Sequence, residues 1–383
     1  MSDVAAWELD QPHEDFRSSV RAFVDRHVRP AVEESEAAGR PPAGLLKEMG
    51  AAGLLGLAVP EEYGGGGGDA LAATLLAEEL ARASGGIAVT ALVSGYMSTP
   101  HIARFGTDGQ RARYLPGLVS GDQIAAIAVT EPGAGSNVAG ITTRATPVDG
   151  GYRLDGTKMF ITNAGIADVF VIAARTGPDG HRGITTFIVE AGSPGLSFGK
   201  PLRKMGWHAS DTREVILDGC RVNEDAVLGQ LNRGFHQIMA AFQLERLNLA
   251  GMGIGHAAES LALATAYARD REVFGAPLIS LQTMRHRLAA LSVELEAAQL
   301  LTYRAAARLD AGHPQAAESV AKAKYFAAIA ANRIVDECVQ VFGGSGFLDE
   351  TPVARHYRDA RVLRIGGGTD EIQLEILAKG LTP

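Results

Sequence analysis

The sequence predicts a mostly α-helical protein with a β domain in the middle of the chain. Apolar residues recur at steps of three and four over the first 120 residues, and again from residue 234 onward. Between these stretches, short apolar runs are separated by turn clusters at 149–151 and 177–180. Hydrophobic residues make up 46% of the 383 residues and charged residues 21%, which allows a large core and excludes wholesale disorder. We therefore expect three domains: an N-terminal helical domain (1–122), a β-barrel-like middle domain (123–230) and a C-terminal four-helix bundle (231–383).

The N-terminal domain shows helical periodicity in several separate stretches. Phe16, Val20 and Phe23 begin an apolar stripe among charged residues that continues, after a break at Pro41 and Pro42, to about residue 60. A run of five glycines at 64–68 ends this section, and further helical patterns cover residues 71–83 and 102–118.

The middle domain carries apolar runs of strand length with no helical pattern between them. An alternation of strands and helices would indicate parallel βαβ units, so its absence favours an antiparallel sheet or barrel. The expected strands lie at 124–129, 169–173, 184–189 and 215–217.

The C-terminal domain has the strongest helical signal. One helix begins near Met239 and runs to about residue 269, and a second covers 278–309. A third is marked by apolar residues at steps of three and four: Phe326, Ala330, Ile334, Cys338 and Val341. Long alanine-rich helices of this kind are typical of an antiparallel bundle.

Composition and missing motifs exclude several function classes. A formal net charge of −8 argues against nucleic acid as the main partner. Two cysteines, Cys220 and Cys338, can build neither a disulfide framework nor a four-cysteine zinc site. Neither H-E-x-x-H nor G-x-S-x-G occurs, so metal-dependent and serine hydrolysis have no support and we expect no metal.

Two glycine patterns do not indicate nucleotide-binding loops. Gly253 and Gly255 lie inside a helical run, where small residues allow two helices to pack closely, and the glycines at 64–68 lack the Lys-Ser/Thr of a P-loop. No run of about 20 apolar residues could span a membrane. The first 16 residues carry acids where a leader peptide would carry bases, so we expect a cytoplasmic protein.

Two segments of the middle domain could bind a polar, flat ligand. Thr-Glu-Pro-Gly-Ala-Gly-Ser at 130–136 follows an apolar strand and forms a turn that exposes backbone N–H groups and two hydroxyls, Thr130 and Ser136, to a polar ring or a phosphate. Gly-Thr-Lys-Met-Phe-Ile-Thr-Asn at 156–163 places an aromatic residue near threonines, where it could cover a flat ring. From the residues alone, the first segment is more often an ordinary tight turn than a site.

These segments, with several others in the same order, resemble the acyl-CoA dehydrogenase family over nearly the whole chain. The resemblance rests on residues 60–65, 130–136, 204–206 with 210–212, 271–275, 340–347, 358–360 and 367–369. It implies the same three-domain fold and an FAD held between the β domain and the bundle.

The resemblance also implies a set of FAD-binding residues. Within the middle domain these are Val129, Thr130, Gly135, Ser136, Phe160 and Thr162. Further contacts are implied for Arg271, Phe274 and Gln282, which would reach the FAD of a neighbouring subunit, and for Gln340, Gly343, Gly344, Thr369 and Glu371. The chain departs from the family where Phe160 replaces a common tryptophan and where Asn137 replaces the usual aspartate.

The catalytic base is the most informative departure. The family removes the α proton of an acyl thioester with a carboxylate, and many members place that glutamate directly before Gly-Thr, where this chain has Gly367. Isovaleryl- and long-chain-type members carry it on the first long helix of the bundle, and the matching residue here is Glu245. The missing side chain at 367 would leave room for that carboxylate, and the backbone N–H of Gly367 would stabilise the thioester oxygen. The alternatives are that Glu245 is a surface acid and the protein a non-catalytic scaffold.

The substrate is less well defined by the resemblance. Ser136, Tyr96, Met97 and Arg246 match positions on the substrate side of the site. An acyl-CoA and an acyl or aminoacyl group (for example prolyl) tethered to a carrier protein both remain possible. The family implies an electron-transfer flavoprotein as acceptor, with dioxygen as the alternative, and a homotetramer or at least a dimer.

Overall fold

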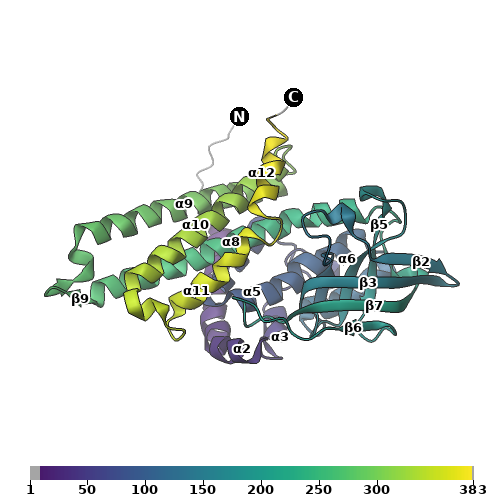
Figure 1. Cartoon of the computed structure of the whole chain (residues 1–383), viewed down its shortest axis with the longest axis horizontal. Coiled ribbons are helices and arrows are strands. Elements are labelled where there is room, and N and C mark those ends of the chain that lie inside the picture. Colours follow the sequence, from purple (N-terminus) through teal and green to yellow (C-terminus); the bar gives the residue numbers. More distant parts are fainter. Residues whose placement is uncertain (1–8, 382–383) are drawn as a thin grey trace.

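The chain folds into a helical part, a sheet and a helical bundle, in the order that the periodicity predicts (Figure 1). The computed structural model describes residues 9–381. Residues 1–8, on which the expectation about a leader peptide partly depends, lie outside the described residues.

The N-terminal part contains seven α-helices in its described residues, several of them started by side-chain caps. The Asp10 carboxylate accepts a hydrogen bond from His13 N, Asp69 accepts one from Ala72 N, and Thr107 exchanges bonds with Gln110 in a capping box. The helices are α1 (Gln11–Phe23), α2 (Val32–Ala38), α3 (Leu45–Ala51), α4 (Ala70–Ala83), α5 (Gly85–Leu92), α6 (Thr99–Phe105) and α7 (Asp108–Ser120), with π-helical turns at η1 (Val24–Val28) and η4 (Val93–Ser98).

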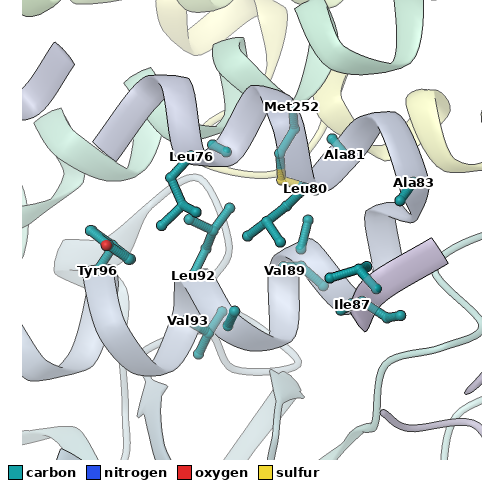
Figure 2. Close-up of a cluster of buried hydrophobic side chains, with 14 of the residues drawn as sticks. Leu76, Leu80, Ala81, Ala83, Ile87, Val89, Leu92, Val93, Tyr96 and Met252 are labelled. Atoms are coloured by element: carbon teal, nitrogen blue, oxygen red, sulfur yellow. The ribbon is translucent and has the colours of Figure 1, made fainter. Parts of the chain in front are cut away.

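The core of this part lies between α4 and the continuous helical segment α5–η4. Leu76 and Leu80 of α4 pack towards Leu92 of α5, and Met252 from the C-terminal part reaches the same cluster (Figure 2). Each side chain of this size stabilises the fold by about 1.5–3 kcal/mol when fully buried. The shared cluster therefore fixes the N-terminal helices to the bundle.

The middle part is an eight-stranded sheet. Its strands are β1 (Ala125–Ala128), β2 (Arg144–Val148), β3 (Gly151–Thr162), β4 (Val169–Arg175), β5 (Ile184–Glu190), β6 (Leu196–Phe198), β7 (Thr212–Asn223) and β8 (Val227–Leu228). They follow the order β6-β7-β3-β2-β4-β5-β8, with β1 added beside β4. Most neighbours pair antiparallel, as predicted, but β4 pairs in parallel with β1 and, at Arg175, with β2.

The C-terminal part is built from three long helices and two short ones. These are α8 (Gly234–Asp270), α9 (Gln282–Asp310), α10 (Ala316–Phe342), α11 (Pro352–Ala360) and α12 (Asp370–Ala378), and a small hairpin of β9 (Glu272–Val273) and β10 (Ala276–Pro277) joins α8 to α9. Gly251 and Gly255 allow α8 to approach α4 closely, since a Cβ on Gly251 would lie 2.6 Å from the carbonyl oxygen of Thr74. A Cβ on Gly253 would lie 3.2 Å from the carbonyl oxygen of Ala327 in α10, and one on Gly255 would collide with the carbonyl oxygen of Glu78 in α4, so the predicted packing role of Gly253 and Gly255 is confirmed. In the part of the chain that the structure describes, no helix could cross a membrane.

Candidate active site

Glu245 and Gly367 lie next to each other, although they belong to different helical elements. Glu245 is in the fourth turn of α8, and Gly367 is in the glycine turn 366–368 that precedes α12. A Cβ placed on Gly367 would lie 3.7 Å from Oε1 of Glu245 and 2.6 Å from Cδ1 of Leu249. The backbone of Gly367 has a φ of 64°, which a residue with a side chain rarely adopts. The space beside Gly367 is thus filled by side chains of α8.

The environment of Glu245 favours a carboxyl group that can take up a proton near neutral pH. Removal from water raises the pKa of Glu245 to about 7, against the opposing effect of the positive charges on Arg246 and Lys324. A carboxylate with this pKa is a stronger base than an exposed glutamate, which is what the removal of a proton from carbon requires.

The glycine turn 366–368 is held by three side chains from three helices. The carbonyl oxygen of Gly367 accepts hydrogen bonds from Arg246 Nε (3.0 Å) and Gln373 Nε2 (3.2 Å). The carbonyl oxygen of Gly368 accepts from Lys324 Nζ (2.6 Å) and Gln373 Nε2 (3.0 Å). Among residues 9–381, no acceptor receives the N–H of Gly367. This N–H is therefore free to bond an oxygen of a ligand.

The turn at 130–136 is anchored from beneath by a buried ion pair. Nζ of Lys158 lies 2.8 Å from Oε1 of Glu131 and also donates to the carbonyl of Val129 (3.0 Å). Glu131 accepts further bonds from the backbone N–H groups of Thr142 and Thr143. Burial alone would raise the pKa of Glu131, but the Lys158 charge and these donors lower it to about 2, so the carboxylate is ionised.

The anchored turn and strand β3 together present groups that suit FAD. Met159 N donates to the carbonyl of Thr130 (2.8 Å), which brings Thr130 beside the β3 segment that carries Phe160 and Thr162. Phe160 has a φ of 59° and a side chain that is 64% exposed, an arrangement that is costly for a lone aromatic residue but suits one that covers a flat ring. A Cβ on Gly135 would meet no atom within 4 Å, so the backbone there is open to a ligand.

A second group of the implied FAD residues lies at the opposite end of α8 (Figure 1). Phe274, at the tip of the β9–β10 hairpin, is 98% exposed, and Arg271 and Gln282 flank the same connection. The rings of Tyr267 and Phe342 stack with centroids 4.4 Å apart, which ties the end of α8 to the end of α10. The remaining members of this group are Gln340, in the last turn of α10, and Gly343 and Gly344, in the 3-10 turn that follows it (Gly343–Phe347).

Arg271 lies far from Glu245 in the same chain. With a helical rise of about 1.5 Å per residue, the stretch of α8 from Glu245 to Arg271 is about 39 Å long. Within the described residues of one chain, the hairpin that carries Phe274 is therefore remote from Glu245 and Gly367. Thr369 and Glu371, at the start of α12, lie with the Glu245 group.

The expected substrate residues differ from one another in burial and in hydrogen bonding. Tyr96 is 1% exposed and its hydroxyl donates to the carbonyl of Leu54, while Met97 is 5% exposed in the same core. Tyr96 thus presents no free polar group to a ligand (Figure 2). Ser136 is exposed in its turn, and Arg246 is buried against Gly367.

Lys324 and Gln373, which hold the glycine turn, belong to none of the predicted motifs. A signal for Lys324 was present, because it occupies a position on the apolar face of α10, four residues after Val320 and three before Ala327. A lysine there has to find a polar partner inside the protein.

Comparison with known proteins agrees with this architecture. Three family models match in succession: "Acyl-CoA dehydrogenase, N-terminal domain" over residues 10–122, the middle domain over 126–220 and the C-terminal domain over 232–382. An acyl-CoA dehydrogenase of Bacillus subtilis is 39% identical, over 96% of this chain and 97% of its own length.

Solved structures of related proteins superpose closely. The butyryl-CoA dehydrogenase of Megasphaera elsdenii shares 37% of residues with a TM-score of 0.94, covering 98% of this chain and 99% of that chain. A glutaryl-CoA dehydrogenase of Mycobacterium smegmatis in complex with FADH2 shares 34% with a TM-score of 0.92, covering 98% and 95%.

Proposed function

Because the chain belongs to the acyl-CoA dehydrogenase family, whose members are FAD-dependent oxidoreductases, we propose that it oxidises an acyl-CoA to the trans-2-enoyl-CoA with Glu245 as the base. The observation that carries this assignment is the position of the Glu245 carboxyl beside the side-chain-free Gly367. The similarity to a butyryl-CoA dehydrogenase supports a short acyl chain as the first substrate to test.

Residues of α8 and of the glycine turn have separate roles in the proposed reaction. Glu245 takes the α proton onto its carboxylate, and the N–H of Gly367 donates to the thioester oxygen on which negative charge develops. Arg246 holds the carbonyl of Gly367 and so supports this donor. When bound, FAD supplies the acceptor for the hydride that leaves the β carbon, and we expect an electron-transfer flavoprotein to reoxidise it.

The cofactor would be held by the turn at 130–136, by β3 and by the start of α12. The exposed Phe160 ring would cover the flavin, with hydrogen bonds from Thr130 and Thr162. Gly135 and Ser136 offer open backbone to the phosphate or substrate side, and Val129 is fixed beneath them by Lys158. Thr369 and Glu371 complete the set from α12.

An anaerobic titration with acyl-CoA esters tests this function directly. We expect the purified yellow protein to lose its visible flavin band on addition of a short acyl-CoA such as butyryl-CoA. A flavin that stays oxidised with every CoA ester, but is reduced by carrier-bound acyl or aminoacyl groups, would overturn the CoA assignment. A protein that binds no FAD would overturn the enzymatic one.

The pH dependence of kcat/KM provides a second test. Since burial raises the pKa of Glu245 to about 7 and the ionised carboxylate is the active form, kcat/KM should rise with pH and level off above that value. Below the pKa, each pH unit should lower kcat/KM about tenfold. If kcat/KM stays constant from about pH 5 to about pH 9, a range that spans this pKa, Glu245 is not the base.

We also propose that a second copy of the chain completes the FAD site with Arg271, Phe274, Gln282, Gln340, Gly343 and Gly344. The separation of these residues from Glu245 along α8, and the exposure of Phe274, support an assembly that is at least a dimer and, as the family resemblance implies, a tetramer. The Arg271 guanidinium forms no ion pair with any residue between 9 and 381, and its planar donors suit a pyrophosphate.

Substitution at the hairpin should therefore weaken cofactor retention. Arg271→Ala removes a charged hydrogen-bond donor, so we expect FAD affinity to fall by about 1.5–3 kcal/mol, measured by flavin release on dilution. Arg269→Ala, at an exposed arginine two residues earlier, is the control. Full FAD retention by a monomer in analytical ultracentrifugation would rule out the contribution of a second copy.

A further inference from the structure

Lys324 is a buried cation that the proposed chemistry does not yet use. Its side chain has no solvent exposure and lies among the alanines of α10, where an unpartnered ammonium group would be strongly destabilising. Its 2.6 Å hydrogen bond ends on the carbonyl of Gly368, one residue from Gly367. The ammonium group of Lys324 thus bonds one peptide carbonyl of the glycine turn.

We propose that Lys324 is a positioning residue for α-proton removal: by holding the carbonyl of Gly368, it fixes the glycine turn so that the N–H of Gly367 stays oriented beside Glu245. This inference rests on the proposed function and deepens it, because it assigns to Lys324 the orientation of the group that stabilises the thioester oxygen.

The glycine turn needs hydrogen bonds from other elements because of its sequence. Three consecutive glycines, Gly366, Gly367 and Gly368, have no side chains that could pack, and glycine loses the most conformational freedom on folding. Gly367 and Gly368 both adopt positive φ, at 64° and 92°. Without bonds from outside, this turn would sample many backbone conformations.

The observed hydrogen bonds fix the peptide planes around Gly367. Arg246 and Gln373 hold the plane that contains the Gly367 carbonyl, and Lys324 and Gln373 hold the next one. On the other side, Gly366 N donates to the carbonyl of Val362 at 2.9 Å. The peptide plane that carries the Gly367 N–H lies between two planes that are fixed in this way, and Lys324 fixes the plane that follows them. Without Lys324, the Gly368 carbonyl would keep only its bond from Gln373, and the turn around Gly367 would lose one of its restraints.

The charge of Lys324 also acts on Glu245. Burial lowers the pKa of Lys324 to about 8, while Asp370, Glu245 and Glu371 favour its charged form and Arg246 disfavours it. Glu245 in turn is faced by two cations, Arg246 on its own helix and Lys324 on α10, and both lower its pKa. Loss of the Lys324 charge should thus raise the pKa of Glu245.

The test compares two substitutions of Lys324 in the FAD-loaded enzyme. Lys324→Met removes both the donor and the charge, whereas Lys324→Gln removes the charge and keeps a donor. We expect Lys324→Met to lower kcat about 10²-fold with little change in KM, as for a misplacement of about 1 Å in an active site. Lys324→Gln should recover part of kcat. In both variants the acidic limb of kcat/KM should move to higher pH.

A readout that does not depend on turnover accompanies the kinetics. Hydrogen exchange over residues 366–373, which include the bonded amides of Gly366 and Gln373, should be faster in Lys324→Met than in wild type when followed by mass spectrometry. Lys322→Met is the matched control, because Lys322 lies on the same helix with its side chain 47% exposed and bonded to Glu318. Its kcat, pH profile and exchange should match the wild type.

The outcomes distinguish a positioning role of Lys324 from a role in stability alone. If Lys324→Met lowers only the melting temperature and leaves kcat, the pH profile and exchange unchanged, the inference is overturned. If no acyl-CoA reduces the wild-type flavin, the proposed function fails instead. In that case faster exchange over residues 366–373 would still support the positioning role of Lys324, and unchanged exchange would overturn it.

Discussion

Glu245→Gln should retain bound FAD but lose its reduction by acyl-CoA, with a rate at least 10²-fold and up to about 10⁴-fold below wild type. Glutamine has nearly the size of glutamate, so the space beside Gly367 stays filled, but its amide cannot accept the α proton. Rapid-mixing measurement of the flavin band under anaerobic conditions gives the rate. The visible spectrum before mixing reports whether FAD is still bound.

Two further variants sharpen this result. Glu245→Asp keeps the carboxylate but withdraws it by one methylene, so we expect a smaller loss than in Glu245→Gln, of up to about 10²-fold. Glu296→Gln changes an exposed glutamate of α9 and should have no effect. Flavin reduction at the wild-type rate in Glu245→Gln would sink the assignment of the base.

Lys158→Met should destabilise the protein by about 3–5 kcal/mol, because it leaves the Glu131 carboxylate buried without its partner. Glu131 is 5% exposed and holds the backbone of residues 142 and 143, so the loss extends to the turn at 130–136. We therefore expect weaker FAD binding as well as a lower midpoint in urea unfolding. Both are measured on the same preparation, with Lys200→Met, at an exposed lysine of the same domain, as control.

A double variant distinguishes an unpaired charge from lost packing. In Lys158→Met with Glu131→Leu neither charge is buried, so most of the lost stability should return. FAD binding should not return with it, because the carboxylate that positions the N–H groups of Thr142 and Thr143 is gone. A Lys158→Met protein as stable as the wild type would show that this pair contributes nothing to the domain.

The strands differ in how well their sequence predicted them. The centres of β1, β4, β5 and β7 are continuous apolar runs and were predicted. The 12-residue strand β3 was missed because it alternates buried and partly exposed residues and is interrupted by Gly156 and a bulge near Lys158. Its cross-strand partners on β7 lie about 60 residues away, so the pairing cannot be predicted from the residues of β3 alone.

Only part of the candidate site could be predicted from the sequence. The resemblance indicated Glu245 and Gly367 together, and the structure places them in proximity. Lys324 and Gln373 lay outside every motif, since their role is to hold backbone carbonyls that motif comparison does not describe. Tyr96 was expected on the substrate side, but its hydroxyl is bonded to Leu54, a contact between segments 42 residues apart in sequence.

The close approach of α8 to α4 limits how this protein can change its specificity. Gly251 and Gly255 bring the backbones of the two helices nearly into contact, only two to three turns beyond Glu245. Any larger residue at these positions would push α8 outward and carry the carboxylate away from Gly367. Adaptation to longer or bulkier acyl groups is therefore confined to exchanges of individual side chains around a helix whose position is fixed.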